Sequence, residues 1–110
     1  MRRFWIPLLL VLAGLILRDT NGGARTDTLP TAVLLVAANP GATVGSSFEF
    51  TIRNTAGAAE TLTVAGGTGG TTSGTMTIAQ NNSKRFLVRF TNVSSGNEAY
   101  TIYSLGTVVH

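Results

Sequence analysis

Side chains that could carry acid–base or nucleophilic chemistry are scarce in this chain. The only histidine is His110, the last of the 110 residues. A catalytic triad needs a histidine that one group orients while the histidine hydrogen-bonds to a nucleophile. A side chain at the end of the sequence is not easily held by a second group, so we expect no fixed triad.

The glutamates do not form the pair that a glycoside hydrolase requires. Hydrolysis of a glycosidic bond uses two carboxyl groups held a set distance apart. Glu49, Glu60 and Glu98 instead lie on outward strand faces or in loops, where carboxylates are usually just solvated. The sequence therefore predicts no catalytic residues and a protein that is not an enzyme.

The segment "RDTNGGARTD" carries oxygen atoms that could bind Ca²⁺, but their order does not match a calcium loop. That loop needs acids or amides at its first, third and fifth positions and a glutamate at its end. We therefore expect no metal site. The favoured interpretation is a turn whose charged residues pair with one another or with a neighbouring chain. These residues are Arg18, Asp19, Arg25 and Asp27.

The glycine-rich segment 66–70, "GGTGG", does not have the sequence of a phosphate-binding loop. Such a loop continues into Lys-Ser or Lys-Thr and a helix whose amino terminus faces the phosphate, and neither follows here. We interpret the segment as a mobile or closely approached turn. No cofactor is expected.

The composition favours a protein that packs against copies of itself. Charged residues make up 12% of the chain, whereas an ordinary soluble protein has about 25%. The net charge of +3 is small, and the cations are interleaved with apolar residues. Nucleic-acid binding needs a dense basic stripe with stacking aromatics, so no nucleic-acid partner is expected. The absence of cysteine excludes disulfides and thiolate metal sites.

The apolar run Phe4–Leu17 is too short for a membrane anchor. A spanning helix requires about 20 apolar residues, and Pro7 interrupts this run. Two interpretations stay open. Basic residues before the run and small residues after it match a secretory signal, which would make the protein secreted. Alternatively, residues 1–13 are an apolar lead-in, and residues 14–19 form the first strand of a single domain of residues 14–110.

Alternating apolar and polar residues predict a series of short strands separated by turn-forming residues. The predicted strands span residues 14–19, 46–54, 60–65, 74–79, 84–93 and 99–109. One short helix is expected near residues 31–38, capped by Thr28 or Thr31. We expect a buried core that includes Phe48, Phe50, Ile52, Phe86, Val88 and Phe90. The sequence thus predicts an all-β fold, an antiparallel β-sandwich of jelly-roll-like type.

Several of these motifs resemble those of a known group of proteins. The block "RD-x-NG-x-x-R-x-D-x-x-PTA" spans Arg18 to Ala32, and a "VGSSF" strand start spans Val44 to Phe48. From Gly14 to His110 the chain resembles small β-rich structural proteins of tailed bacteriophages and some large DNA viruses. The resemblance implies a capsid decoration or a head- or tail-fibre component located in the virion, and it favours a trimer.

The functional expectation is therefore assembly of a homo-oligomer that docks on capsid or fibre proteins. Uncharged strand faces can be buried between subunits with little desolvation of charge. The residues expected at subunit contacts are Arg18, Asp19, Arg25, Asp27, Leu87, Tyr103 and Leu105. The alternative is a secreted or surface-attached binding module that presents its Gly/Thr-rich loops to a carbohydrate or protein.

Overall fold

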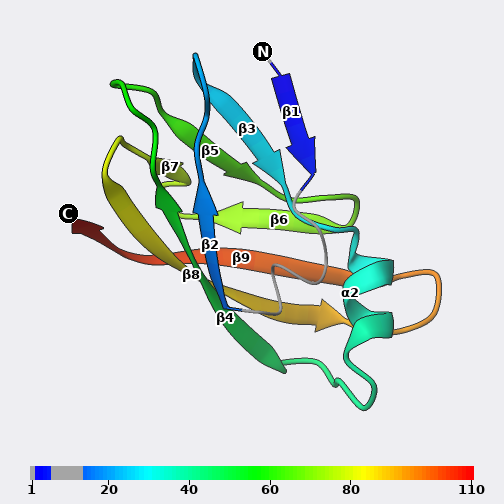
Figure 1. The fold of residues 1–110 in the computed structure, drawn as a ribbon. Coiled ribbons are helices and arrows are strands. Elements are labelled where there is room, and N and C mark those ends of the chain that lie inside the picture. The colour runs from blue at the N-terminus through cyan, green and yellow to red at the C-terminus, as the bar shows by residue number, and fades with distance from the viewer. Residues whose placement is uncertain (1, 6–13) are drawn as a thin grey trace.

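Two β-sheets and one short helix make up the protein in this computed structural model, which describes residues 2–5 and 14–110 (Figure 1). In chain order the elements are β1 (Arg2–Trp5), β2 (Leu15–Arg18), β3 (Arg25–Thr28), α2 (Ala32–Ala38), β4 (Ser47–Asn54), β5 (Leu62–Ala65), β6 (Gly70–Ser73), β7 (Thr77–Ile78), β8 (Asn82–Asn92) and β9 (Ala99–Val109). The protein is mainly β with one short helix, as the sequence predicts.

Both sheets are mixed. One contains five strands in the order β2-β4-β8-β9-β6, and the other contains β3, β5 and β7 with β1 at its edge beside β3. The pairs β4–β8, β8–β9 and β5–β7 are antiparallel. The pairs β2–β4, β6–β9, β1–β3 and β3–β5 are parallel. The strand order is not clearly that of a jelly roll or a closed barrel.

The prediction of purely antiparallel pairing was wrong because the turn after β2 does not fold the chain back as a hairpin. β2 and β3 lie in different sheets, so the chain crosses between the sheets from Arg18 to Arg25. It returns to the first sheet at β4, after the helix. A strand that returns after a long connection can pair in parallel with the earlier strand.

One hydrophobic core lies between the two sheets and takes alternate residues of β4 and β8. Phe50, Ile52, Phe86, Val88 and Phe90 are buried, as predicted. The rings of Phe50 and Phe86 stack with their centroids 5.4 Å apart. Phe48, also expected in the core, is only half-buried and packs against its edge.

Helix α2 covers one end of the core beside β9, at the right of Figure 1. Thr31 is its cap, because the Thr31 hydroxyl oxygen accepts a hydrogen bond from the Leu34 N–H at 3.3 Å. The prediction of a short helix is confirmed, and Thr31 rather than Thr28 caps it. Ala32 and Leu35 are buried against the sheets.

The glycine-rich loop is a closely approached turn that packs on Tyr100. The buried Tyr100 hydroxyl donates to the Pro30 carbonyl oxygen at 2.8 Å and accepts from the Gly67 N–H at 2.9 Å. A Cβ atom at Gly70 would overlap the Tyr100 ring. Of the two interpretations of this loop, the close approach is therefore correct.

The amino-terminal lead-in is in part a strand. The backbone of β1 pairs in parallel with β3 (Figure 1). Residues 6–13 of the expected lead-in lie outside the described residues, as does residue 1. The strand expected at 14–19 is present as β2. Within the described part of the chain, no helix is long and apolar enough to cross a membrane.

Candidate association surface

The five-stranded sheet presents a broad surface on the side away from the core, here called the outer face. Side chains alternate along each strand, so the residues between core positions point outward. Pairing aligns these residues in four rows across β2, β4, β8 and β9. The rows are Leu17, Arg53, Ser83 and Val108; Leu15, Thr51, Arg85 and Gly106; Glu49, Leu87 and Tyr103; and Ser47, Arg89 and Thr101.

Apolar side chains are exposed on both flanks of the outer face. On β2, Leu15 and Leu17 are 59% and 65% exposed, and Val108 on β9 is 58% exposed. Single exposed apolar residues are common and need no explanation. These three share one face, and two of them are adjacent on the same strand face, so they mark a surface suited to a partner.

The structure places the three apolar residues that the sequence predicts for subunit contacts on or beside this face. Leu87 and Tyr103 are cross-strand neighbours on β8 and β9, and both are half-buried. Leu105 is 43% exposed and lies at a β-bulge, where β9 carries one extra residue opposite Arg85 and Phe86. Their outward orientation is as predicted, and their contact with another subunit stays a prediction.

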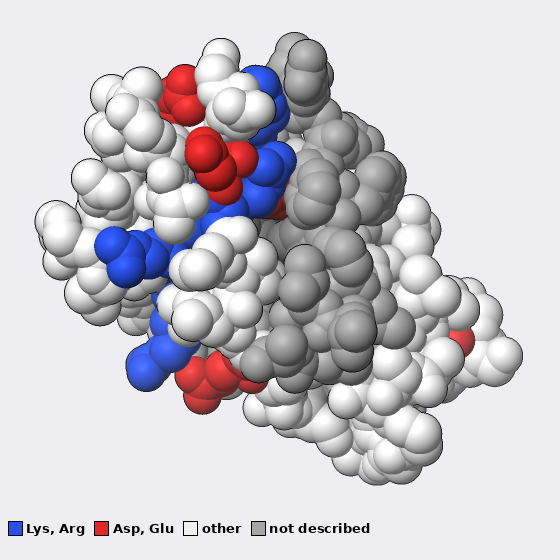
Figure 2. All heavy atoms as spheres, viewed as in Figure 1, with Lys and Arg blue, Asp and Glu red and all other residues white. Residues whose placement is uncertain are grey.

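Four of the fourteen residues in the rows are charged, and three of the four are basic. The Arg85 Nε and Glu49 Oε1 atoms lie 3.3 Å apart, and both side chains are at least half exposed. Such a surface pair contributes about 0–1 kcal/mol to stability. Arg53 and Arg89 complete the set of charged residues in the four rows. Figure 2 shows charged side chains gathered on the side where Figure 1 places β2 and β4, among wide uncharged surface.

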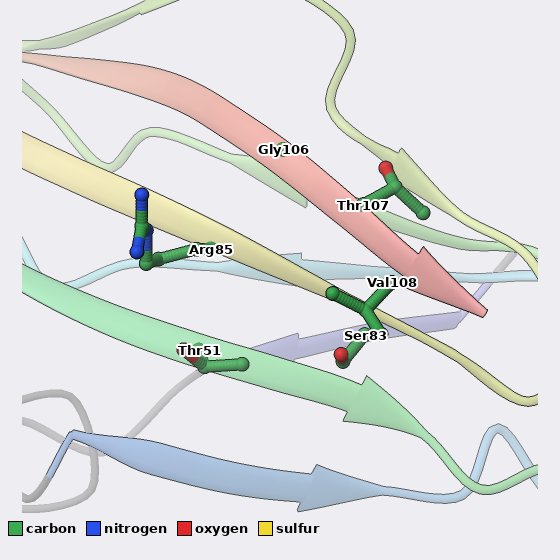
Figure 3. A pocket seen from close by; sticks show the side chains of 6 residues that line it. All are labelled: Thr51, Ser83, Arg85, Gly106, Thr107 and Val108. Atoms are coloured by element: carbon green, nitrogen blue, oxygen red, sulfur yellow. The ribbon is translucent and has the colours of Figure 1, made fainter. Parts of the chain in front are cut away.

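A shallow hollow of about 290 Å³ lies on the outer face between β4, β8 and β9 (Figure 3). It is lined by Thr51, Ser83, Arg85, Gly106, Thr107 and Val108. Gly106 has no side chain and lies directly opposite Arg85 in the β8–β9 pair. The hollow therefore combines hydroxyl groups, one guanidinium and an apolar rim.

The predicted charged turn is held together within the chain. The Arg18 Nε donates to Asp27 Oδ2 at 2.9 Å, which links β2 of one sheet to β3 of the other. Asp27 is 1% exposed, and burial raises its pKa although the hydrogen bond and charge of Arg18 act in the opposite direction. Because the Asp27 carboxylate is enclosed and paired with Arg18, we leave Asp27 out of the proposed contact surface.

The other two charged residues of the turn are nearer the surface. Asp19 is exposed, and its Oδ1 accepts from the Asn21 N–H at 2.8 Å. Arg25 is half-buried and donates to the Ala24 carbonyl oxygen at 3.0 Å. These contacts shape the turn and leave Asp19 accessible. The role of both residues in a subunit contact stays a prediction.

Glu60, in a loop of the opposite sheet, holds the same turn in place through hydrogen bonds. Its Oε1 accepts from the Thr20 hydroxyl at 2.6 Å and from the Gly22 N–H at 3.2 Å. These hydrogen bonds, that from Thr20 foremost, hold the pKa of Glu60 below its ordinary value of 4.5. The sequence predicts a solvated carboxylate at Glu60, whereas the structure gives this residue a structural role.

His110 is held more firmly than its terminal position suggests. Its Nε2 lies 2.9 Å from the Ser83 Oγ, and its N–H donates to the Asn81 carbonyl oxygen at 2.8 Å. The reason is that β9 stays paired with β8 up to Val109. A serine and a histidine alone do not make a triad, which also needs a group that orients the histidine.

Carboxylates and histidine do not gather into a metal centre among the described residues, where no three residues of the types His, Cys, Asp and Glu lie together. The comparisons with known proteins also return nothing: no family model, curated protein or solved structure matches this chain. The candidate surface is therefore defined by its geometry and composition.

Proposed function

We propose that this protein is a non-enzymatic structural module that acts by self-association through the outer face. The observation that carries the proposal is the group of exposed apolar side chains on both flanks of that face. Burial of apolar surface drives association. A surface of this kind fits an assembly component.

The wider role that we propose is that of a virion component, a capsid decoration or fibre protein, as the resemblance described above implies. Docking on capsid or fibre proteins is part of that proposal; the three-fold symmetry that the resemblance implies is not. The alternative of a loop-presenting binding module gains no support, since Gly67 and Gly70 of the glycine-rich loop pack against Tyr100.

The test is the mass in solution. We expect the intact chain to scatter light as a multiple of its 11.5 kDa monomer and to dissociate on dilution. The double variant Leu87→Glu, Leu105→Glu places two carboxylates on or beside the outer face. It should be a monomer at concentrations where the intact chain is assembled, because each carboxylate must be desolvated to enter the contact.

A matched control tests whether association depends on the outer face in particular or on exposed apolar side chains anywhere on the protein. Val33 and Leu34 on α2 are 55% and 52% exposed, and they lie away from the outer face. The double variant Val33→Glu, Leu34→Glu should keep the assembled mass. Circular dichroism must show that both variants are folded. A monomeric intact chain at every concentration, or equal dissociation of both variants, would contradict the proposal.

A further inference from the structure

Among the described residues, nothing requires position 106 to be glycine. Its φ is not in the left-handed region, and a Cβ atom built there would have nothing within 4 Å. It lies inside β9, where glycine weakens a strand and often marks the close approach of a ligand or another backbone. The neighbouring bulge does not explain it either, because the bulge does not require a positive φ at this position. The hollow at Gly106 therefore leaves room for something outside the chain.

Large and small residues alternate across the outer face in a way that makes the face complementary to itself. Three of the four rows place a large residue on one of the central strands and a smaller one beside it on the other. Across β4 and β8 these pairs are Ser47 with Arg89, Thr51 with Arg85, and Arg53 with Ser83. Across the flanking strands, Leu15 on β2 shares a row with Gly106 on β9.

We infer that two copies of the chain pack outer face to outer face about a two-fold axis, which lies between β4 and β8 and runs parallel to them. This inference rests on the proposed function and names the partner as a second copy. The axis sets β4 of one copy over β8 of the other and β2 over β9, and it keeps each row opposite itself. Leu15 of each copy then lies over the hollow at Gly106 of the partner subunit.

The positions of the charged residues on the outer face support this two-fold arrangement. Arg85 lies opposite Thr51 of the partner subunit, and Arg53 lies opposite Ser83 of the partner subunit. Glu49 lies opposite Leu87 of the partner subunit, between the rows that hold Arg85 and Arg89. No two like charges face each other, and like-charge contacts are what an interface must avoid. The face therefore meets the requirement of a two-fold contact, in which one patch must complement itself.

The size of the face predicts a weak dimer. Four strands about 4.8 Å apart, with about seven residues at about 3.4 Å each, give a patch of about 450 Å² per chain before side-chain relief is counted. Two such patches bury about 900 Å² or more, close to the about 1,000 Å² of the smallest specific interfaces. We therefore expect a dimer that dissociates on dilution.

A cross-link between two introduced cysteines tests the pairing directly, because the chain has no cysteine of its own. In the double variant Leu15→Cys, Gly106→Cys the two positions lie three strands apart within one chain, or about 14 Å, whereas sheets that pack face to face lie about 10 Å apart. A bis-maleimide with a spacer too short for the first distance and long enough for the second can therefore join only cysteines of two different chains. After treatment with this reagent we expect a covalent dimer on a denaturing gel.

A second variant tests the hollow without any cross-link. Gly106→Val fills the space that Leu15 of the partner subunit would occupy, while the monomer should fold as well as before, since nothing lies within 4 Å of the new Cβ. We expect the dissociation constant to rise about tenfold or more, or about 1.4 kcal/mol. Gly57→Val is the matched control, because Gly57 is exposed in a loop and also has nothing within 4 Å.

The outcomes separate this inference from the proposed function. Covalent dimers from Leu15→Cys, Gly106→Cys, with little from Leu15→Cys, Gly57→Cys, support the two-fold contact. Covalent trimers or longer ladders would overturn it and leave self-association in place, because they require a head-to-tail contact. If the chain assembles but gives no cross-link, the two-fold contact alone is overturned. The same holds if Gly106→Val leaves the dissociation constant unchanged. A monomeric intact chain would overturn both.

Discussion

Tyr100→Phe is the sharpest test of how the sheets, the helix and the glycine-rich loop are joined. The Tyr100 hydroxyl donates to the Pro30 carbonyl oxygen just before α2 and accepts from the Gly67 N–H in the loop, and both hydrogen bonds are buried. The variant removes the hydroxyl and keeps the ring. It therefore isolates the two hydrogen bonds from the packing of the ring against Gly70.

The expected loss follows from the two groups that are left without a partner. A buried donor or acceptor that loses its hydrogen bond costs about 1–3 kcal/mol, so we expect about 2–6 kcal/mol for Gly67 and Pro30 together. A domain of this size is stable by about 5–15 kcal/mol. At about 4 °C per kcal/mol, the melting temperature should fall by about 8–24 °C.

Thermal and urea unfolding followed by circular dichroism measure this loss, and Tyr103→Phe is the matched control. Tyr103 is the other tyrosine of the chain and is half-buried on the outer face. We expect its variant to stay within about 0.5 kcal/mol of the intact chain. Equal melting temperatures for Tyr100→Phe and Tyr103→Phe would refute the buried hydrogen bonds as the link between loop and helix.

Two further predictions concern the core and the turn. Phe50→Ala should cost about 3–5 kcal/mol because Phe50 is buried and stacks on Phe86, whereas Phe48→Ala at the half-buried edge should cost clearly less; equal losses in urea titrations would refute the strand register. Glu60 has a lowered pKa, so its ionised form stabilises the fold above pH 4.5, and that contribution is lost as the pH falls through the lower folded-state value. The stability difference between the intact chain and Glu60→Gln should therefore be larger at pH 6 than at pH 3, and a difference independent of pH would contradict the role of the Thr20 hydrogen bond.

The sequence was informative where one side of a strand is apolar. Core and surface residues alternate along β4, along β8 from Lys84 and along β9 up to Tyr103, so the existence and the buried faces of these strands could be predicted. β3 and β6 were missed because they lack that alternation. Two residues of β3 on the side of Leu62 and Val64 are Arg25 and Asp27, and β6 reads Gly-Thr-Thr-Ser, which is typical of a turn.

The candidate surface could be predicted only in part, for a related reason. Alternation identified Leu87 and Tyr103 as outward residues on predicted strands. It did not identify the exposed side of β2 because Leu15, Ile16 and Leu17 are all apolar, so no periodicity shows which of them is buried. The hollow at Gly106 depends on which residues of β8 lie beside Gly106. A local sequence pattern does not show how two strands are paired.

The block from Arg18 to Ala32, on which the resemblance to viral structural proteins rests, is accounted for by folding. Arg18 and Asp27 bridge the two sheets, Asn21 adopts a positive φ of 51° in the turn, and Thr31 caps the helix. Each residue meets a demand of the chain's own architecture, so the block would persist in proteins that share this fold and differ in function. The assembly proposal must therefore rest on the outer face, where the described part of the chain gives no structural reason for glycine at 106 or for exposed leucines at 15 and 17. Substitutions on that face should change association and leave folding intact, whereas those in the block should do the reverse.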